Sequence, residues 1–135
     1  MKTTKRSRSL LAVMGMMAGL VLAVPAARAH HSIALEFDME KELTVTGTIT
    51  EMEWRNPHGW LHIDVTDASG AVQSWAIEFT AANALYRRGW RKEDLPTGAT
   101  VTVTGFHARD GSNTLGALEV TLADGRKLFA GSGNR

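Results

Sequence analysis

The side chains best suited to chemistry are histidines, and two of them, His30 and His31, directly follow a stretch that is typical of an export signal. If the signal is cut after Ala29, His30 becomes the first residue of the mature chain, and its free α-amine and ring Nδ1 can chelate one metal ion. His31 offers a second mode, which uses the amine, a deprotonated amide and its own ring. Nitrogen donors of this kind suit Cu(II), which takes tetragonal nitrogen sites and outcompetes other divalent ions. The spacing therefore predicts copper as the small ligand.

Two further histidines could supply additional nitrogen ligands, with His107 behind them. His58 lies at the tip of a predicted hairpin, and His62 lies on the following strand, on the same face as Asp64. Each has a simpler explanation: a bond from His58 to the turn backbone, a solvated strand face for His62 and Asp64, or closure of a strand end by His107. The first two histidines of the mature chain could likewise be a solvated start without a metal. The predicted metal ligands, which depend on convergence in space, are His30, His31, His58 and His62.

A second feature that could bind a ligand is the pair of tryptophans, Trp54 and Trp60, on either side of a predicted turn. Aromatic side chains on the outer face of a small barrel can stack on bases or sugars. The competing interpretation is packing, either across strands or against the core. The ligand face that the pattern predicts consists of Trp54, Asn56, Trp60 and Asp64.

Signatures of the common enzyme classes are missing from the sequence. It has no Cys, no phosphate-binding glycine loop, no H-E-x-x-H and no G-x-S-x-G. We therefore predict no catalytic residue and favour a non-enzymatic binding domain. Two alternatives stay open: a copper-dependent oxidative enzyme in which a brace at His30 activates oxygen or peroxide, and a metal-free module that docks a protein or glycan through the hairpin at 54–60.

These residues must be positioned by strands, and the alternation of apolar and polar residues predicts three of them in a row. Residues 42–54 alternate with β-branched side chains, which predicts a strand. The apolar residues move from odd-numbered to even-numbered positions near Glu51, which indicates a bulge in the strand. Gly47 in the middle of the strand indicates a bend. Strands at 60–66 and 72–79 complete a meander, with Trp60, His62 and Asp64 facing outward.

One helix is expected after the meander, over residues 81–88, with Thr80 as its cap and Gly89 just beyond its end. Turn residues and alternation then predict strands at 100–108 and 114–122 and a short strand at 126–129. Three strands, one helix and two or three strands predict an all-β fold: a five- to six-stranded OB-fold-like barrel with one short helix between strands 3 and 4. An immunoglobulin-like sandwich would need about seven strands and no helix in the middle.

Several short motifs are spread along the chain: Ala29-His30-His31-Ser32, Glu36-Phe37-Asp38, Glu53-Trp54-Arg55-Asn56-Pro57-His58, Arg87-Arg88-Gly89-Trp90, Asp110-Gly111-Ser112-Asn113 and Gly125-Arg126-Lys127. Together they resemble an uncharacterised family of short exported bacterial proteins, a domain-of-unknown-function family. The resemblance covers nearly all of the mature chain. It implies export and a single small domain, and it assigns no activity and no ligand.

The first 29 residues read as a signal peptide: a basic start, an apolar run over 10–24 and a small-residue site ending at Ala29. Cleavage there predicts a periplasmic or secreted protein without a transmembrane segment. Cleavage after Ala26 would place His30 at position four and remove the amine chelate. The remaining residues, 30–135, should form one domain, with an N-terminal arm over 30–41 and a frayed tail over 131–135.

Removing the signal changes the charge of the protein. The signal holds five of the 15 basic residues and none of the 14 acidic ones, so the mature chain has ten basic and 14 acidic residues and a net charge of −4. Nucleic-acid binding depends on basic side chains that neutralise phosphates, so a nucleic-acid partner is not expected. The expected partner is a small ligand or another exported protein, whose identity the sequence leaves open.

Overall fold

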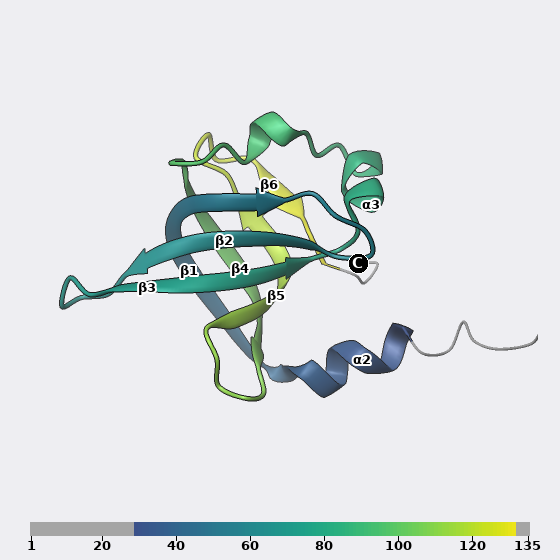
Figure 1. Ribbon diagram of the computed structural model, residues 1–135, viewed down its shortest axis with the longest axis horizontal. Helices are drawn as coiled ribbons and strands as arrows, with labels where there is room; N and C mark the ends of the chain where they lie inside the picture. The colour runs from purple at the N-terminus through teal and green to yellow at the C-terminus, as the bar shows by residue number, and fades with distance from the viewer. Residues whose placement is uncertain (1–28, 132–135) are drawn as a thin grey trace, which may run out of the picture. The chain divides into compact units, whose positions relative to one another are not determined.

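The computed structural model describes residues 29–131, with side chains from Ile33 onward. All but the last residue of the predicted signal, and most of the predicted tail, lie outside these residues. The chain divides into two units, Met1–His31 and Ser32–Arg135, and the described part of the second unit is a β-barrel (Figure 1). The elements are α2 (Ala29–Glu36), β1 (Phe37–Glu53), β2 (Gly59–Thr66), β3 (Val72–Phe79), α3 (Ala82–Arg87), the 3-10 turn η1 (Lys92–Asp94), β4 (Thr100–Ala108), β5 (Thr114–Thr121) and β6 (Lys127–Phe129).

The six strands form one sheet in the order β3-β2-β1-β4-β5-β6, and β3 also pairs with β5. This last pairing is parallel, joins Ala76 to Thr114 and Glu78 to Gly116, and closes the sheet into a barrel. A long first strand shared by both halves, a meander and a helix between β3 and β4 are the features of an OB-fold-like barrel. The predicted fold class and the position of its helix are confirmed.

The first strand is long because it serves two partners. Its first part pairs with β4 and its last part pairs with β2, with Thr48 opposite both Thr100 and Asp64. The register shifts between Ile49 and Glu51, which is the predicted bulge. At Gly47 a Cβ atom would lie 2.6 Å from the carbonyl oxygen of Asp64, so only glycine lets the two strands approach where β1 changes partner.

The predicted arm over 30–41 has regular structure that the sequence did not reveal. It contains α2 and the start of β1, where Phe37 pairs with Ala108 and is only 3% exposed. The register then shifts between Phe37 and Glu42, so the intervening residues break the alternation that marks the rest of the strand. A helix in addition to the expected one was therefore missed, and β1 begins five residues before the predicted start at Glu42.

The core fills the barrel and is closed by α3 and the residues after it. Leu85 of α3 and Trp90 are both fully buried, and the Trp90 ring meets Phe79 edge-on at 5.5 Å between centroids. The indole N–H of Trp90 donates a 3.0 Å hydrogen bond to the Phe129 carbonyl. This bond connects the end of β6 to the plug that α3 and Trp90 form where they close the barrel. Gly89 has a φ of 96° and ends the helix as predicted.

The predicted cap of α3 is wrong. The N-cap residue is Ala81, and no side chain at that position bonds to the helix. The backbone N–H of Thr80 instead donates to the Ala130 carbonyl at 2.9 Å. The first turn of α3 is capped from elsewhere in the chain, by the hairpin between β1 and β2.

Candidate functional site

A groove runs along the outer face of β2 and β3 and has two compartments that share Glu36, Trp60 and Glu78. The hairpin compartment, about 360 Å³, is completed by the hairpin residues Arg55, Asn56, Pro57 and His58. The loop compartment, about 510 Å³, is lined by both apolar and polar residues. The apolar ones are Leu35, Phe37 and Ala108, and the polar ones are Arg109, Asp110, Ser112 and Thr114. Both volumes fall in the range of small-molecule sites, roughly 300–1,000 Å³.

Strand register places Trp60 at the centre of the groove. It lies opposite Glu53 of β1 on one side and opposite Glu78 of β3 on the other. Each carboxylate holds a histidine: His62 Nε2 lies 2.8 Å from Glu53 Oε1, and His58 Nδ1 lies 2.5 Å from Glu78 Oε1. The indole therefore sits between two histidine–carboxylate pairs, of which only the His58 pair lines the groove.

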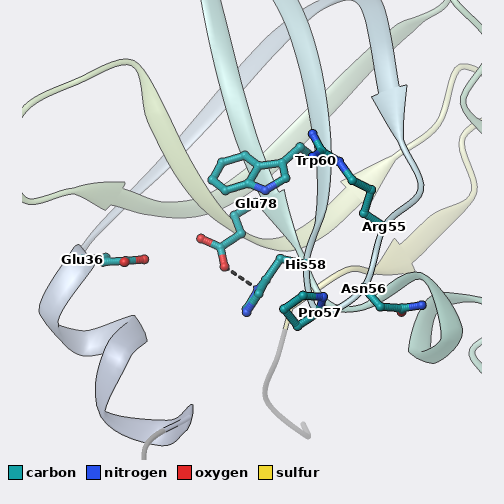
Figure 2. Close-up of a pocket in the computed structure, with 7 residues that line it drawn as sticks. All are labelled: Glu36, Arg55, Asn56, Pro57, His58, Trp60 and Glu78. Carbon is teal, nitrogen blue, oxygen red and sulfur yellow. Dashed lines mark ion pairs between the residues drawn. The ribbon is translucent and has the colours of Figure 1, made fainter.

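Figure 2 shows His58 and Glu78 pointing toward one another, with Glu36 reaching toward them from the other side. The Nδ1 atom of His58 is buried and makes this ion-pair contact but no aligned hydrogen bond. Glu36 is held by the loop after β4, because Arg109 donates its backbone N–H to the Glu36 carbonyl at 2.9 Å and its Nε–H to the Ala34 carbonyl at 2.9 Å. The backbone at Glu36 is thus fixed, and Glu36 and Glu78 place one carboxylate on each side of the groove.

The electrostatics of Glu78 are unfavourable in the free protein. Its side chain is 12% exposed, and this burial raises the pKa of its carboxyl above the usual value of 4.5. The nearby Glu36 carboxylate raises the pKa further, while His58 opposes the shift. A cation in the groove would relieve both the burial cost and the repulsion.

The hairpin that forms one wall is fixed against α3. Its Asn56–Pro57 peptide bond is cis. The Arg55 carbonyl accepts a 3.0 Å hydrogen bond from the N–H of Ala82, and Asn56 Oδ1 accepts a 3.2 Å bond from the N–H of Asn83. These are first-turn amides that a helix cannot satisfy by itself, so the hairpin caps α3.

The predicted metal ligands are only partly accounted for. His58 lines the groove, whereas His62 bonds to Glu53 outside it. The side chains of His30 and His31 lie outside those that the structure describes. His107 is engaged elsewhere, with Nε2 2.9 Å from the Ser112 carbonyl and its ring 5.9 Å from that of Trp75. Among the described residues, no three His, Cys, Asp or Glu side chains are grouped closely enough to hold a metal ion.

The predicted ligand face divides in the same way. Trp60 and Asn56 line the groove, whereas Trp54 stacks on Tyr86 of α3 at 5.3 Å between ring centroids and packs against the core. Asp64 lies further along β2, where its Oδ1 accepts a 2.7 Å bond from Ser74 Oγ. Trp54 therefore has the packing role that was the competing interpretation.

Sequence reasoning missed several groove residues: Glu36, Glu78, Arg109, Asp110, Ser112 and Thr114. Glu78 could have been found, because the alternation of β3 places it on the outward face and the register places it beside Trp60. Glu36 could not, since it lies in the segment without a clear period. The polar residues after β4 join the groove only because the barrel closes.

Comparison with known proteins gives a family and distant structural similarity to solved proteins. A family described as a family of unknown function (DUF6152) matches residues 18–117. The crystal structure of a mitochondrial single-stranded DNA binding protein from S. cerevisiae is similar with a TM-score of 0.46 and 17% identity, covering 62% of this chain and 94% of that one. No curated protein matches the chain. Within the described residues, no helix has the length and apolar character that crossing a membrane requires.

Proposed function

The chain belongs to the DUF6152 family, a family of unknown function, and we propose that it is an exported, non-enzymatic domain that binds Cu(II) in the hairpin compartment. The observation that supports this proposal is the arrangement of His58, which has the Glu78 carboxylate against its Nδ1 atom and Glu36 across the groove. Histidines that bind metals commonly present their second ring nitrogen to a carboxylate, which fixes the tautomer and the ring orientation. Glu78 would do this for His58 and leave the Nε2 lone pair for the metal.

The charge of the compartment favours a cation. Glu36 and Glu78 face the same space, and Arg55, the basic residue in the compartment lining, is engaged in an ion pair with Glu53. The burial and repulsion that raise the Glu78 pKa make the empty groove unfavourable for two ionised carboxylates. A bound cation would offset this cost.

The remaining nitrogen donors are expected from the mature N-terminus. Cleavage after Ala29 would add a free α-amine to the rings of His30 and His31. Three or four nitrogen donors favour Cu(II) over Zn(II) and other divalent ions. The oxidative enzyme would use the same ligands, so it differs from the binding domain only in reactivity.

A Cu(II) titration of the metal-free exported protein, monitored by electron paramagnetic resonance after its mass has established the mature start, tests the proposal. The informative pair is His58→Ala and His62→Ala, because both histidines contact a glutamate and only His58 lines the groove. We expect His62→Ala to bind like the wild type. His58→Ala should weaken binding and change the nitrogen hyperfine pattern, and Glu78→Gln should reduce affinity by about 10- to 100-fold.

Three results would contradict the proposal: no tight Cu(II) binding, a mature start other than His30, or a His58→Ala spectrum identical to that of the wild type. The last would mean that the N-terminal chelate binds copper without the groove. Oxygen or peroxide consumption by the copper-loaded protein with a reductant would favour the oxidative enzyme instead.

A further inference from the structure

The loop compartment is not part of the proposed copper site, and its lining contains apolar and hydroxyl side chains that do not line the hairpin compartment. It extends from Trp60 to the loop after β4 and is the larger of the two compartments, about 510 Å³ against about 360 Å³. Its lining combines apolar residues, among them Leu35, which is 75% exposed, with hydroxyl and charged groups. A lining of both kinds suits a ligand that itself has apolar and polar faces.

Trp60 supplies a flat, partly exposed aromatic surface that borders both compartments. The face of an indole ring is electron-rich, so it attracts the slightly positive C–H groups that cover one face of a sugar ring. The position of Trp60 between the β1–β2 hairpin and the β4–β5 loop is the region where barrels of this type bind oligomeric ligands.

The polar groups of this lining are held in place by hydrogen bonds within the β4–β5 loop. Asp110 Oδ1 accepts a 2.9 Å bond from the backbone N–H of Ser112, and Ser112 Oγ donates to Thr114 Oγ1 at 3.1 Å. Gly111 has a φ of 77°, which allows this tight turn, and His107 Nε2 contacts the Ser112 carbonyl at 2.9 Å. A free carboxylate oxygen and the Thr114 hydroxyl hydrogen remain for a ligand. Neighbouring acceptors and donors of this kind match vicinal hydroxyl groups, and their fixed positions reduce the entropy lost on binding.

The charge of the groove restricts which oligomers fit. Glu36, Glu78 and Asp110 line it, and Arg55 is paired with Glu53. Arg109 keeps its positive charge, because its Nε–H bonds to the neutral Ala34 carbonyl, so three carboxylates outweigh one unpaired guanidinium. Such a lining disfavours phosphates and uronic acids and accepts neutral or amine-bearing rings.

We propose that the loop compartment is a subsite for one ring of a neutral or amine-bearing oligosaccharide, stacked on Trp60 with its hydroxyls bonded to Asp110 and Thr114. The ligand continues past Trp60 toward Glu36 and Glu78, where an amine would be bound most tightly. This subsite does not depend on copper.

Titration calorimetry with defined sugar oligomers tests this subsite, on the mature protein in the presence of a chelator so that no metal contributes. The probes are a glucosamine hexamer at a pH where its amines are protonated, its N-acetylated form, an oligogalacturonate and oligolysine. We expect the glucosamine hexamer to bind more tightly than the acetylated hexamer, and the oligogalacturonate not to bind. If neither sugar hexamer binds, or if only oligolysine does, the proposal is wrong.

Matched variants locate the ligand within the groove. Asp110→Asn keeps an oxygen that can accept the Ser112 bond, and Thr114→Val keeps the side-chain shape, so both should fold and each should weaken sugar binding several-fold. Asp64→Asn, on β2 but outside the groove, should have no effect. Trp60→Ala should reduce affinity about tenfold or more, as removing an aromatic stacking platform does. Unchanged affinity in both Asp110→Asn and Thr114→Val would overturn the assignment of this compartment.

Discussion

The cap that the β1–β2 hairpin provides for α3 can be tested with two substitutions, Asn56→Ala and Thr80→Ala. Asn56 Oδ1 accepts the N–H of Asn83, whereas Thr80, the cap expected from the sequence, lies before an N-cap residue that makes no side-chain bond. Removing a capping side chain costs about 0.5–2 kcal/mol of protein stability. The Asn56–Asn83 bond is 3.2 Å long and solvent-exposed, which favours the lower half of that range, about 1 kcal/mol.

For a domain of this size, about 1 kcal/mol corresponds to a decrease of about 4–8 °C in melting temperature. Asn56→Ala should show this decrease in thermal unfolding followed by circular dichroism, and urea unfolding should show a lower midpoint with an unchanged slope. Asn56→Asp should retain most of the stability because aspartate caps helices as well as asparagine does. Thr80→Ala should change the free energy of unfolding by about 0.5 kcal/mol or less. If Thr80→Ala destabilises the protein more than Asn56→Ala does, the capping interpretation is wrong.

Three further outcomes concern the rest of the barrel. Because burial and Glu36 raise the Glu78 pKa, the folded state binds the Glu78 proton more tightly than the unfolded state does, so the free energy of unfolding should fall as pH rises from about 4.5 through the folded pKa. Urea unfolding at several pH values should show that Glu78→Gln makes this fall smaller. The same dependence of unfolding free energy on pH in Glu78→Gln as in the wild type would contradict the raised pKa. Gly47→Ala should destabilise by about 1–3 kcal/mol in urea unfolding, because the new methyl group would meet the Asp64 carbonyl, and wild-type stability would mean that the strands separate easily. Trp90→Ala should cost about 3–5 kcal/mol through a cavity in the plug, and a loss below about 1 kcal/mol would show that the barrel end does not depend on it.

Local patterns predicted the meander and the helix of this fold. Alternation over β1, β2 and β3 follows from one buried and one solvated face, and the bulge at Glu51 appears in the sequence as a change of parity. The start of β1 gave no such signal, because the register shift after Phe37 removes the alternation. Closure by the parallel pairing of Ala76 with Thr114 joins residues far apart in the sequence and leaves no local mark.

The candidate site was predictable to the same extent. His58, Asn56 and Trp60 are local to one hairpin and were found, whereas Glu36 and the polar residues after β4 reach the groove only through tertiary contacts. Trp54 and Trp60 look alike in the sequence, and only the position of Tyr86 on α3 separates the packing tryptophan from the groove tryptophan.

The bonds from the hairpin to α3 also connect groove occupancy to the dynamics of the barrel end. The amides of Ala82 and Asn83 exchange their hydrogens with solvent only when the bonds to Arg55 and Asn56 open. A ligand that stabilises the hairpin must slow this exchange by thermodynamic linkage, even though it touches neither amide. These two amides are therefore internal reporters, and they allow a library of unlabelled compounds to be screened for groove ligands by hydrogen–deuterium exchange.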